Sequence, residues 1–467
     1  MEIEYIDKGQ DKYPENITDL MKLARKSQSG DSYSSSLIAV CILCKHKKVN
    51  SKFFRYIDLA IEQGDQSLPF FLDILFTEGY TEDGFKIEQS EELRFKYLLK
   101  RKSLSSISSV ITLARNNSER QKKVIAAAKT NQLHPIYNEL LCDLSELIEN
   151  DDSKLFSYVD NLNSIYSFFL NNRHSLLAKP IALTEEEYMT HYTNIQAIHS
   201  MLRIPKNFSE YEEYRHKYPV LRLYNTAYMN DPEEGLYLFD CEELKEIVPY
   251  IEEERYYRTY IASFTTHKKD DLTMWRLYGQ DGKGLSIVLP QKDYKMVFPS
   301  IIDIFKESFH SQLNDSDIEE KNILLYKVSY DCTSVRLSMT EKFNELKSLI
   351  HKNKDKENSS LVNYLYRFFA KASDEIRYLY KNPQYKTEKE FRYLSFHRIE
   401  SEKVKLDERE IPHLYVETPP DLFRKGVEIV IGPKAEKEID IKLDIEYRLK
   451  RYGFNDIKVS ISKAKYR

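Results

Sequence analysis

The stretch "RTYIASFTT" at residues 258–266 decides the fold class of the second half of this chain. Its β-branched and aromatic residues alternate with small or polar ones, which is typical of a strand with two different faces. Helical stretches at 341–380 and 436–451 accompany it, so the sequence predicts an α+β domain whose sheet is built from distant segments. The other predicted strands are "VLRLYN" (220–225), "GLSIVLP" (284–290), "LLYKVSYD" (324–331), "EFRYLSFH" (390–397) and "GVEIVIGP" (426–433).

The predicted α+β domain spans residues 181–467. Two polar, charged stretches, near residues 299–323 and 331–380, are expected to be helical insertions on the sheet rather than part of its framework. Within the second, the charge run "HKNKDKENSS" at 351–360 is most simply a solvated loop or helix break.

Residues 1–180 carry apolar positions at helical spacing between short polar breaks, and they predict an all-α region. Four segments, starting at residues 34, 67, 103 and 133, are weakly similar at an interval of about 33 residues, the period of tetratricopeptide-type helix pairs. The stretch 60–75 resembles the Sel-like variant of that repeat. Stacked helix pairs form a solenoid with a concave surface, so this region is expected to bind a protein partner. An irregular helical bundle is the alternative.

Length and composition limit the class of protein. A chain of 467 residues predicts two to three domains. Its 74 acidic and 70 basic side chains give a formal net charge of -4, so no global basic field indicates nucleic acid or an anionic membrane. The longest apolar run, residues 37–44, is well short of a membrane span, and the N-terminus lacks the pattern of a signal peptide.

The cysteines indicate a reducing environment. There are five, an odd number thinly spread, so they form no disulfide framework, and a cytoplasmic location is expected. Cys41 and Cys44 form a lone C-x-x-C in an apolar helical run, which we interpret as core packing rather than a zinc or redox site.

Four clusters in the second half combine residue types that a sheet does not need. Each also has a structural interpretation. Asp231 and Pro232 suit a turn followed by a helix start, Trp275 and Tyr278 suit one buried helix face, and residues 388–392 suit a solvated charge ladder. The clusters are "THYTNIQAIHSML" (190–202), "LYNTAYMNDPEEG" (223–235), "SFTTHKKDDLTMWRLYGQDGKGLSIVL" (263–289) and "YKNPQYKTEKEFRYLSF" (380–396).

In order and spacing these clusters resemble the bacterial domain-of-unknown-function family 2971. The resemblance covers roughly residues 185–462 and departs in two places: extra residues precede "LRLYN", and Tyr385 stands where tryptophan is common. The matching elements are His191-Tyr192-Thr193, Leu221-Arg222, Asn230-Asp231-Pro232-Glu233, Ser263-Phe264-Thr265, Trp275-x-x-Tyr278, Gly284 to Ile287, Glu388-x-Glu390-x-Arg392 and Ile431-Gly432.

The same layout is similar to that of the ADP-ribosyltransferase fold, which implies a split sheet, NAD as the substrate and no metal. Nicotinamide leaves through an oxocarbenium-like transition state, which a nearby carboxylate stabilises. The resemblance implies Glu390 as that carboxylate and Glu388 as its companion on the acceptor side. On the first strand, His191 is implied to be catalytic and to bind the nicotinamide ribose. The other implied NAD-binding residues are Tyr192, Thr193, Ser263, Phe264 and Thr265, with Trp275 or Tyr278 as a stacking ring and Arg222 and Arg392 at the pyrophosphate.

Three functions are compatible with these residues. The first is an NAD-using transferase or glycohydrolase with a partner-recognising helical region, by analogy a bacterial toxin or antiphage effector. The second is a metal-dependent nuclease or phosphodiesterase in which Asp231, Glu233, Glu388 and Glu390 bind Mg²⁺. The third is a non-catalytic ligand-sensing interaction module. The sequence determines neither the macromolecular target, protein or nucleic acid, nor the oligomeric state.

Overall fold

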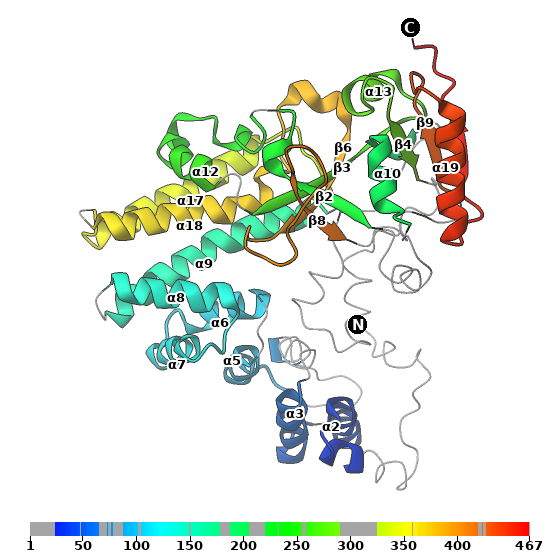
Figure 1. The fold of residues 1–467 in the computed structure, drawn as a ribbon. Coiled ribbons are helices and arrows are strands. Elements are labelled where there is room, and N and C mark those ends of the chain that lie inside the picture. The colour runs from blue at the N-terminus through cyan, green and yellow to red at the C-terminus, as the bar shows by residue number, and fades with distance from the viewer. Residues whose placement is uncertain are drawn as a thin grey trace. The chain divides into compact units, whose positions relative to one another are not determined.

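The helices lie in the first part of the chain, and a mixed sheet with further helices forms the second part (Figure 1). The described residues fall into two compact units, one up to Asn163 and one from Ser164, and α9 contributes to both. The computed structural model describes residues 24–46, 48–64, 72, 76–77, 87–100, 104–148, 151–177, 187–204, 220–231, 233–254, 258–289, 325–356, 358–418, 423 and 426–466.

In the first unit, helices that are neighbours in the sequence pack against each other: α2 on α3, α5 on α6, α6 on α7, and α7 on α8. The predicted repeat segment at 67–79 lies almost wholly outside the described residues. The helices are α2 (Ser32–His46), α3 (Ser51–Glu62), α5 (Glu91–Leu99), α6 (Leu104–Ala114), α7 (Ser118–Lys129), α8 (Pro135–Leu147) and α9 (Asp152–Ser175).

Local chemistry explains where these helices begin and how they pack. Asn50 starts α3, because its side-chain oxygen accepts from the backbone N–H groups of Lys52 and Phe53, both at 3.0 Å. Phe53 and Ile57 then lie one turn apart on the same helix face and are fully buried. Helices of this length are marginal alone, so the packing of such faces holds the unit together.

The second unit contains a ten-stranded sheet among the described residues, ordered β10-β9-β4-β1-β3-β2-β8-β7, with β6 on β3 and β5 on β6. Each of the six predicted β-rich runs contains one of its strands. All pairs are antiparallel except β9 with β10, which α19 connects. The strands are β1 (Glu187–Thr193), β2 (Leu221–Asn225), β3 (Thr259–Lys268), β4 (Leu285–Val288), β5 (Leu325–Lys327), β6 (Glu390–Phe396), β7 (Lys405–Leu406), β8 (Leu414–Thr418), β9 (Glu428–Ile431) and β10 (Lys458–Ile461).

The sheet forks at β3, because β2 and then β1 pair with the same edge of this strand. One edge of β3 pairs with β6 from Thr259 to Thr265. The other edge pairs with β2 at Tyr260 and Ile261 and with β1 from Thr265 to Lys268. Residues 262–264 therefore lie between two ladders on that edge, where β1 turns away to pair with β4.

Helices cover the two faces of the sheet. On the face that we call the α19 face, Ile287 and Ile429 belong to one core with Ile445 of α19 (Glu438–Arg451). On the opposite face, the α13 face, Tyr192 and Val430 pack with Trp275 of α13 (Leu272–Tyr278). The remaining helical elements near the sheet are α10 (Ile195–Met201), η2 (Thr226–Tyr228), η3 (Tyr237–Phe239), η4 (Glu242–Ile247) and α12 (Val248–Glu254).

The stretch 331–380 forms two long helices, α17 (Thr333–Lys352) and α18 (Ser359–Arg377), which lie along each other (Figure 1). The rings of Phe343 and Phe369 meet between them at 5.2 Å, and both side chains are fully buried. These helices therefore have an apolar core of their own despite their charged outer faces. The other expected insertion, at 299–323, lies outside the described residues. Across the part of the chain that the structure describes, no helix is long and apolar enough to cross a membrane.

Candidate functional site

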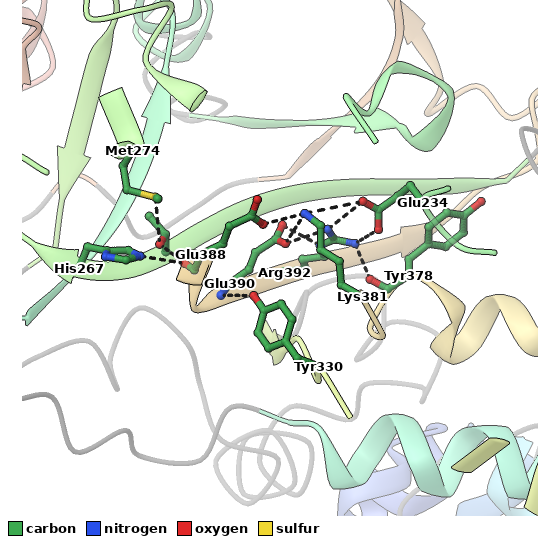
Figure 2. A network of polar contacts seen from close by, with 10 residues as sticks. Glu234, His267, Met274, Tyr330, Tyr378, Lys381, Glu388, Glu390 and Arg392 are labelled. Carbon is green, nitrogen blue, oxygen red and sulfur yellow. Dashed lines mark hydrogen bonds and ion pairs between the residues drawn. The ribbon is translucent and has the colours of Figure 1, made fainter. Parts of the chain in front are cut away.

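The strongest concentration of buried charge lies where η5 (Pro383–Glu388) meets β6. Lys389 joins the two elements in the left-handed conformation, with φ 47°. Glu388 and Glu390 on either side of it both reach Lys381 (Figure 2), whose Nζ lies 2.7 Å and 3.3 Å from their Oε2 atoms. The unusual backbone at Lys389 thus brings two carboxylates onto one ammonium group.

Arg392 completes the cluster (Figure 2). Its Nε and Nη2 donate to the two oxygens of Glu390, both at 2.8 Å, in a bidentate pair. Its Nη1 donates to Glu234 Oε1 and to the carbonyl oxygen of Tyr378, both at 2.6 Å. We call Glu234, Lys381, Glu388, Glu390 and Arg392 the charge cluster; none of these residues is more than 6% exposed.

The surroundings keep Glu390, Lys381 and Arg392 ionised. Burial would raise the pKa of Glu390, but the neighbouring Arg392 and Lys381 lower it to about 2. Burial likewise opposes the positive charges, yet the adjacent carboxylates raise the pKa values of both Lys381 and Arg392. Three carboxylates and two cations leave the charge cluster with a formal excess of one negative charge.

Hydroxyl groups line the cluster on the same side. Ser263 forms a side-chain hydrogen bond with Glu390, which contributes to the low pKa of that carboxylate. Thr265 donates its hydroxyl to the carbonyl oxygen of Glu388. Burial and the nearby Glu388 and Glu390 carboxylates raise the pKa of Tyr278, so its hydroxyl stays neutral beside them. The structure thus brings together six of the residues selected from the sequence: Ser263, Thr265, Tyr278, Glu388, Glu390 and Arg392.

His191 does not join this group, because the strand register places it on the other face. Thr190 pairs with Thr265, and Thr265 pairs with Glu390, so these three share the α13 face. His191 is one residue further on and therefore points to the α19 face, where its ring lies 5.2 Å from that of Phe264. His191 and Glu390, which were both expected at the nicotinamide ribose, therefore lie on opposite faces of the sheet and do not meet directly.

His191 instead forms a hydrogen bond with β3 at the point where the sheet forks. Its Nδ1 lies 2.8 Å from the carbonyl oxygen of Ser263, on the stretch of β3 edge between the two ladders. A carbonyl only accepts, so Nδ1 carries the hydrogen, and burial lowers the pKa of the ring. Ser263 consequently contacts His191 through its backbone and Glu390 through its side chain.

The other first-strand and ring residues have separate positions. Thr193 shares the α19 face with His191 by alternation along β1, and Phe264 belongs to the buried core of that face. Tyr192 lies on the α13 face, where its ring meets Trp275 edge-to-face at 5.1 Å. Trp275 is fully buried and donates its indole N–H to Asp270 at 2.7 Å. Of the two candidate stacking rings, Tyr278 is therefore the one beside the charge cluster.

Arg222 is also outside the charge cluster. It lies on β2, over the ring of Tyr415 at 4.2 Å, and its guanidinium donates weakly to Glu408 at 3.3 Å and 3.4 Å. Arg392, by contrast, is fully engaged by Glu390 and Glu234, so it presents no open guanidinium face.

Two members of the charge cluster, Lys381 and Glu234, and the neighbouring Tyr330 were not predicted from the sequence. Lys381 lies in the segment 380–396 with Glu388 and Glu390, and a lysine close to two glutamates was a possible signal. Glu234 follows Glu233, but nothing in the sequence tells which of the two turns inward. Tyr330 accepts the backbone N–H of Glu390 at 3.0 Å, a contact that has no sequence signature.

The four carboxylates proposed to bind Mg²⁺ are not arranged as a metal site in the described part of the chain. Asp231 accepts from the backbone N–H of Glu233 at 2.9 Å, as a turn residue does, while Glu388 and Glu390 are bound by Lys381. Within the described ranges, no group of three or more His, Cys, Asp or Glu side chains is arranged to hold a metal ion.

Comparison with known proteins supports the family resemblance in part. A family model described as "Protein of unknown function (DUF2971)" matches residues 274–393. This range contains four of the five charge-cluster residues and Tyr278, but not Glu234, His191 or Ser263. No curated protein and no solved structure matches the chain.

Proposed function

We propose that the second unit cleaves the nicotinamide–ribose bond of NAD, as an ADP-ribosyltransferase-like enzyme or an NAD glycohydrolase. The observation that carries the proposal is the formal negative excess of the buried charge cluster. The departure of nicotinamide leaves positive charge on the ribose, and an ionised carboxylate that is already in place stabilises that charge without reorganisation. The low pKa of Glu390 keeps its carboxylate ionised at neutral pH.

The roles of the two glutamates follow from their surroundings. Glu390 is held from both sides by Arg392 and Ser263, so it is the more rigid carboxylate and suits the reacting ribose. Glu388 has Lys381 as its charged partner and Tyr278 beside it, which suits orientation of the acceptor hydroxyl or water. Tyr278 also offers an aromatic ring for the nicotinamide.

The fork of the sheet supports a binding site on the α13 face. Ser263 contacts Glu390 there through its side chain, and its carbonyl oxygen lies 2.8 Å from His191 Nδ1, so His191 would act on a ribose at Glu390 through Ser263 rather than by direct contact. Thr190, in the same cross-strand row as Glu390, is the first-strand hydroxyl on the correct face. The forked pairing of β3 is compatible with the split sheet that an ADP-ribosyltransferase-like fold implies.

The helical first unit is proposed to select the target. Helices that pack on their sequence neighbours form extended surfaces, and such surfaces commonly bind other proteins. The acceptor of ADP-ribose is then a protein or nucleic acid delivered by that contact, as a toxin or antiphage effector would require.

The test is release of nicotinamide from NAD by the purified full-length chain, followed by chromatography. We expect Glu390→Gln to abolish release, because the amide cannot stabilise positive charge. Glu400→Gln is the matched control, since Glu400 is exposed and the change is chemically the same. Glu388→Gln is expected to lower transfer to an acceptor more than it lowers hydrolysis.

Loss of activity in Glu390→Gln must not come from unfolding, so the emission of the sole tryptophan, Trp275, is recorded for each variant. Tyr278→Phe, which keeps the ring and removes the hydroxyl, provides a second and gentler change. If NAD stays intact with folded wild-type protein, with and without candidate acceptors, the proposal fails.

The ion pairs within the charge cluster favour a second candidate function, a non-catalytic ligand-sensing module. All five charged groups are buried and each has a partner within the cluster, as a structural network would. In that case the glutamate variants lower stability in proportion to any loss of phenotype, and NAD is never consumed.

A further inference from the structure

A second group of interacting side chains, none of them a member of the charge cluster, lies on β2, η2, β8 and the turn that precedes β8. It contains two arginines and four rings in mutual contact. We call it the arginine–aromatic cluster, and its members are Arg222, Tyr224, Tyr228, Arg409, His413 and Tyr415.

Both guanidinium groups converge on Tyr224. Arg409 lies over the Tyr224 ring at 5.3 Å, and the Tyr224 hydroxyl lies beside the guanidinium of Arg222. The rings of Tyr224 and Tyr415 are 5.9 Å apart, and Arg222 covers the second of them at 4.2 Å. Arg409 is also paired with the buried carboxylate of Asp407 at 2.9 Å, whereas the carboxylate partner of Arg222, Glu408, is exposed. Arg222 is therefore the guanidinium that is more readily opened to phosphate oxygens, which guanidinium groups bind in bidentate fashion.

The contacts of Arg222 leave part of its guanidinium group available to an anion. Its side chain is only 10% exposed, yet the carboxylate that it meets, Glu408, is 73% exposed on the turn. Its Nε is buried and finds no hydrogen-bond partner in the part of the chain that is described. The cross-strand carboxylate opposite Arg222, Glu417, is bound by Lys405 instead.

Planar surfaces flank the two arginines. The rings of Tyr228 and His413 are stacked at 3.8 Å with an angle of 1° between them, and both side chains are partly exposed. Arg409 donates to His413 Nδ1 at 2.8 Å, so this ring is neutral and joins the guanidinium site. Stacking on such rings is a sequence-tolerant way to hold a nucleobase.

We propose that the arginine–aromatic cluster binds a nucleoside diphosphate, with the phosphates on Arg222 and Arg409 and the base against the stacked rings. Glu408 occupies the place of one phosphate when no ligand is bound. The inference does not depend on NAD cleavage at Glu390.

Isothermal titration of the full-length chain with ADP, adenosine and inorganic pyrophosphate tests the proposal. ADP is expected to bind more tightly than either fragment. Glu408→Ala is expected to tighten ADP binding by about two- to fivefold, because an exposed ion pair that competes with the ligand is removed. Glu410→Ala removes the same charge from the same turn and is the matched control; it is expected to leave the affinity unchanged.

Arg222→Lys keeps the charge but loses the bidentate fork, and is expected to weaken ADP binding by at least about tenfold. The proposal is overturned if neither the wild type nor Glu408→Ala binds ADP at millimolar concentration. It is also overturned if Glu408→Ala and Glu410→Ala have equal effects, or if pyrophosphate binds as tightly as ADP.

Discussion

The pH dependence of stability in the second unit is expected to depend on Glu390. A pKa of about 2 in the folded state, against 4.5 for the unperturbed side chain, corresponds to about 3 kcal/mol of stabilisation. A lowered folded pKa favours the ionised form, so this stability is fully present above pH 4.5. It is lost as the pH falls towards 2.

Glu390→Gln removes that titration. At pH 7 the variant is therefore expected to be less stable than the wild type by about 3 kcal/mol, and the difference is expected to shrink steadily below pH 4.5. Glu400→Gln, at an exposed position, is expected to leave both the stability at pH 7 and its pH dependence close to those of the wild type.

Urea denaturation followed by tryptophan emission is the appropriate assay. The chain has a single tryptophan, Trp275, which is fully buried in the second unit, so its signal reports the unfolding of that unit. Free energies of unfolding are compared at pH 7, 5, 4 and 3 for the three proteins. A constant difference between wild type and Glu390→Gln over this range would refute the ionised, ion-paired state of Glu390 on which the reasoning depends.

Substitutions at three further positions test other parts of the same geometry. Lys389→Gly is expected to be neutral or stabilising by up to about 1 kcal/mol, whereas Lys389→Val is expected to destabilise by about 1–2 kcal/mol in urea denaturation, because φ is 47° there. Gly284→Ala is expected to lower the thermal midpoint by several degrees, since its new Cβ would lie 2.3 Å from the carbonyl oxygen of Thr193; an unchanged midpoint would contradict this close approach. His191→Phe leaves the Ser263 carbonyl without its donor and is expected to cost about 1–3 kcal/mol at pH 7; His191→Gln, which can still donate, should lose less.

Strand positions and much of the charge cluster were predictable from the sequence, for identifiable reasons. Alternation within each run, as in residues 258–266, reports a local property, because the pleat fixes which residues share a face of one strand. For the same reason Glu390 and Arg392, two residues apart, share a face of β6 and pair, although the ladder expected to be solvated at 388–392 is buried. Lys381 was harder to select, because its contact with Glu388 depends on the left-handed backbone at Lys389, and a lysine carries no sequence signal for that conformation.

Relations between strands were not predictable, and His191 shows why. Alternation places Thr190 and His191 on opposite faces of β1, but it does not say which of them shares a face with Glu390 two strands away. That depends on two registers, Thr190 with Thr265 and Thr265 with Glu390, and neither is encoded within any single run. A shift of one residue in either register would have placed His191 and Glu390 on the same face of the sheet. The fork of the sheet was not predictable either. There β1 leaves β3, and the Ser263 carbonyl oxygen contacts His191 instead of a strand partner. The histidine–tyrosine–threonine strand and the E-x-E-x-R strand therefore meet through β3, where Ser263 contacts His191 by its backbone and Glu390 by its side chain.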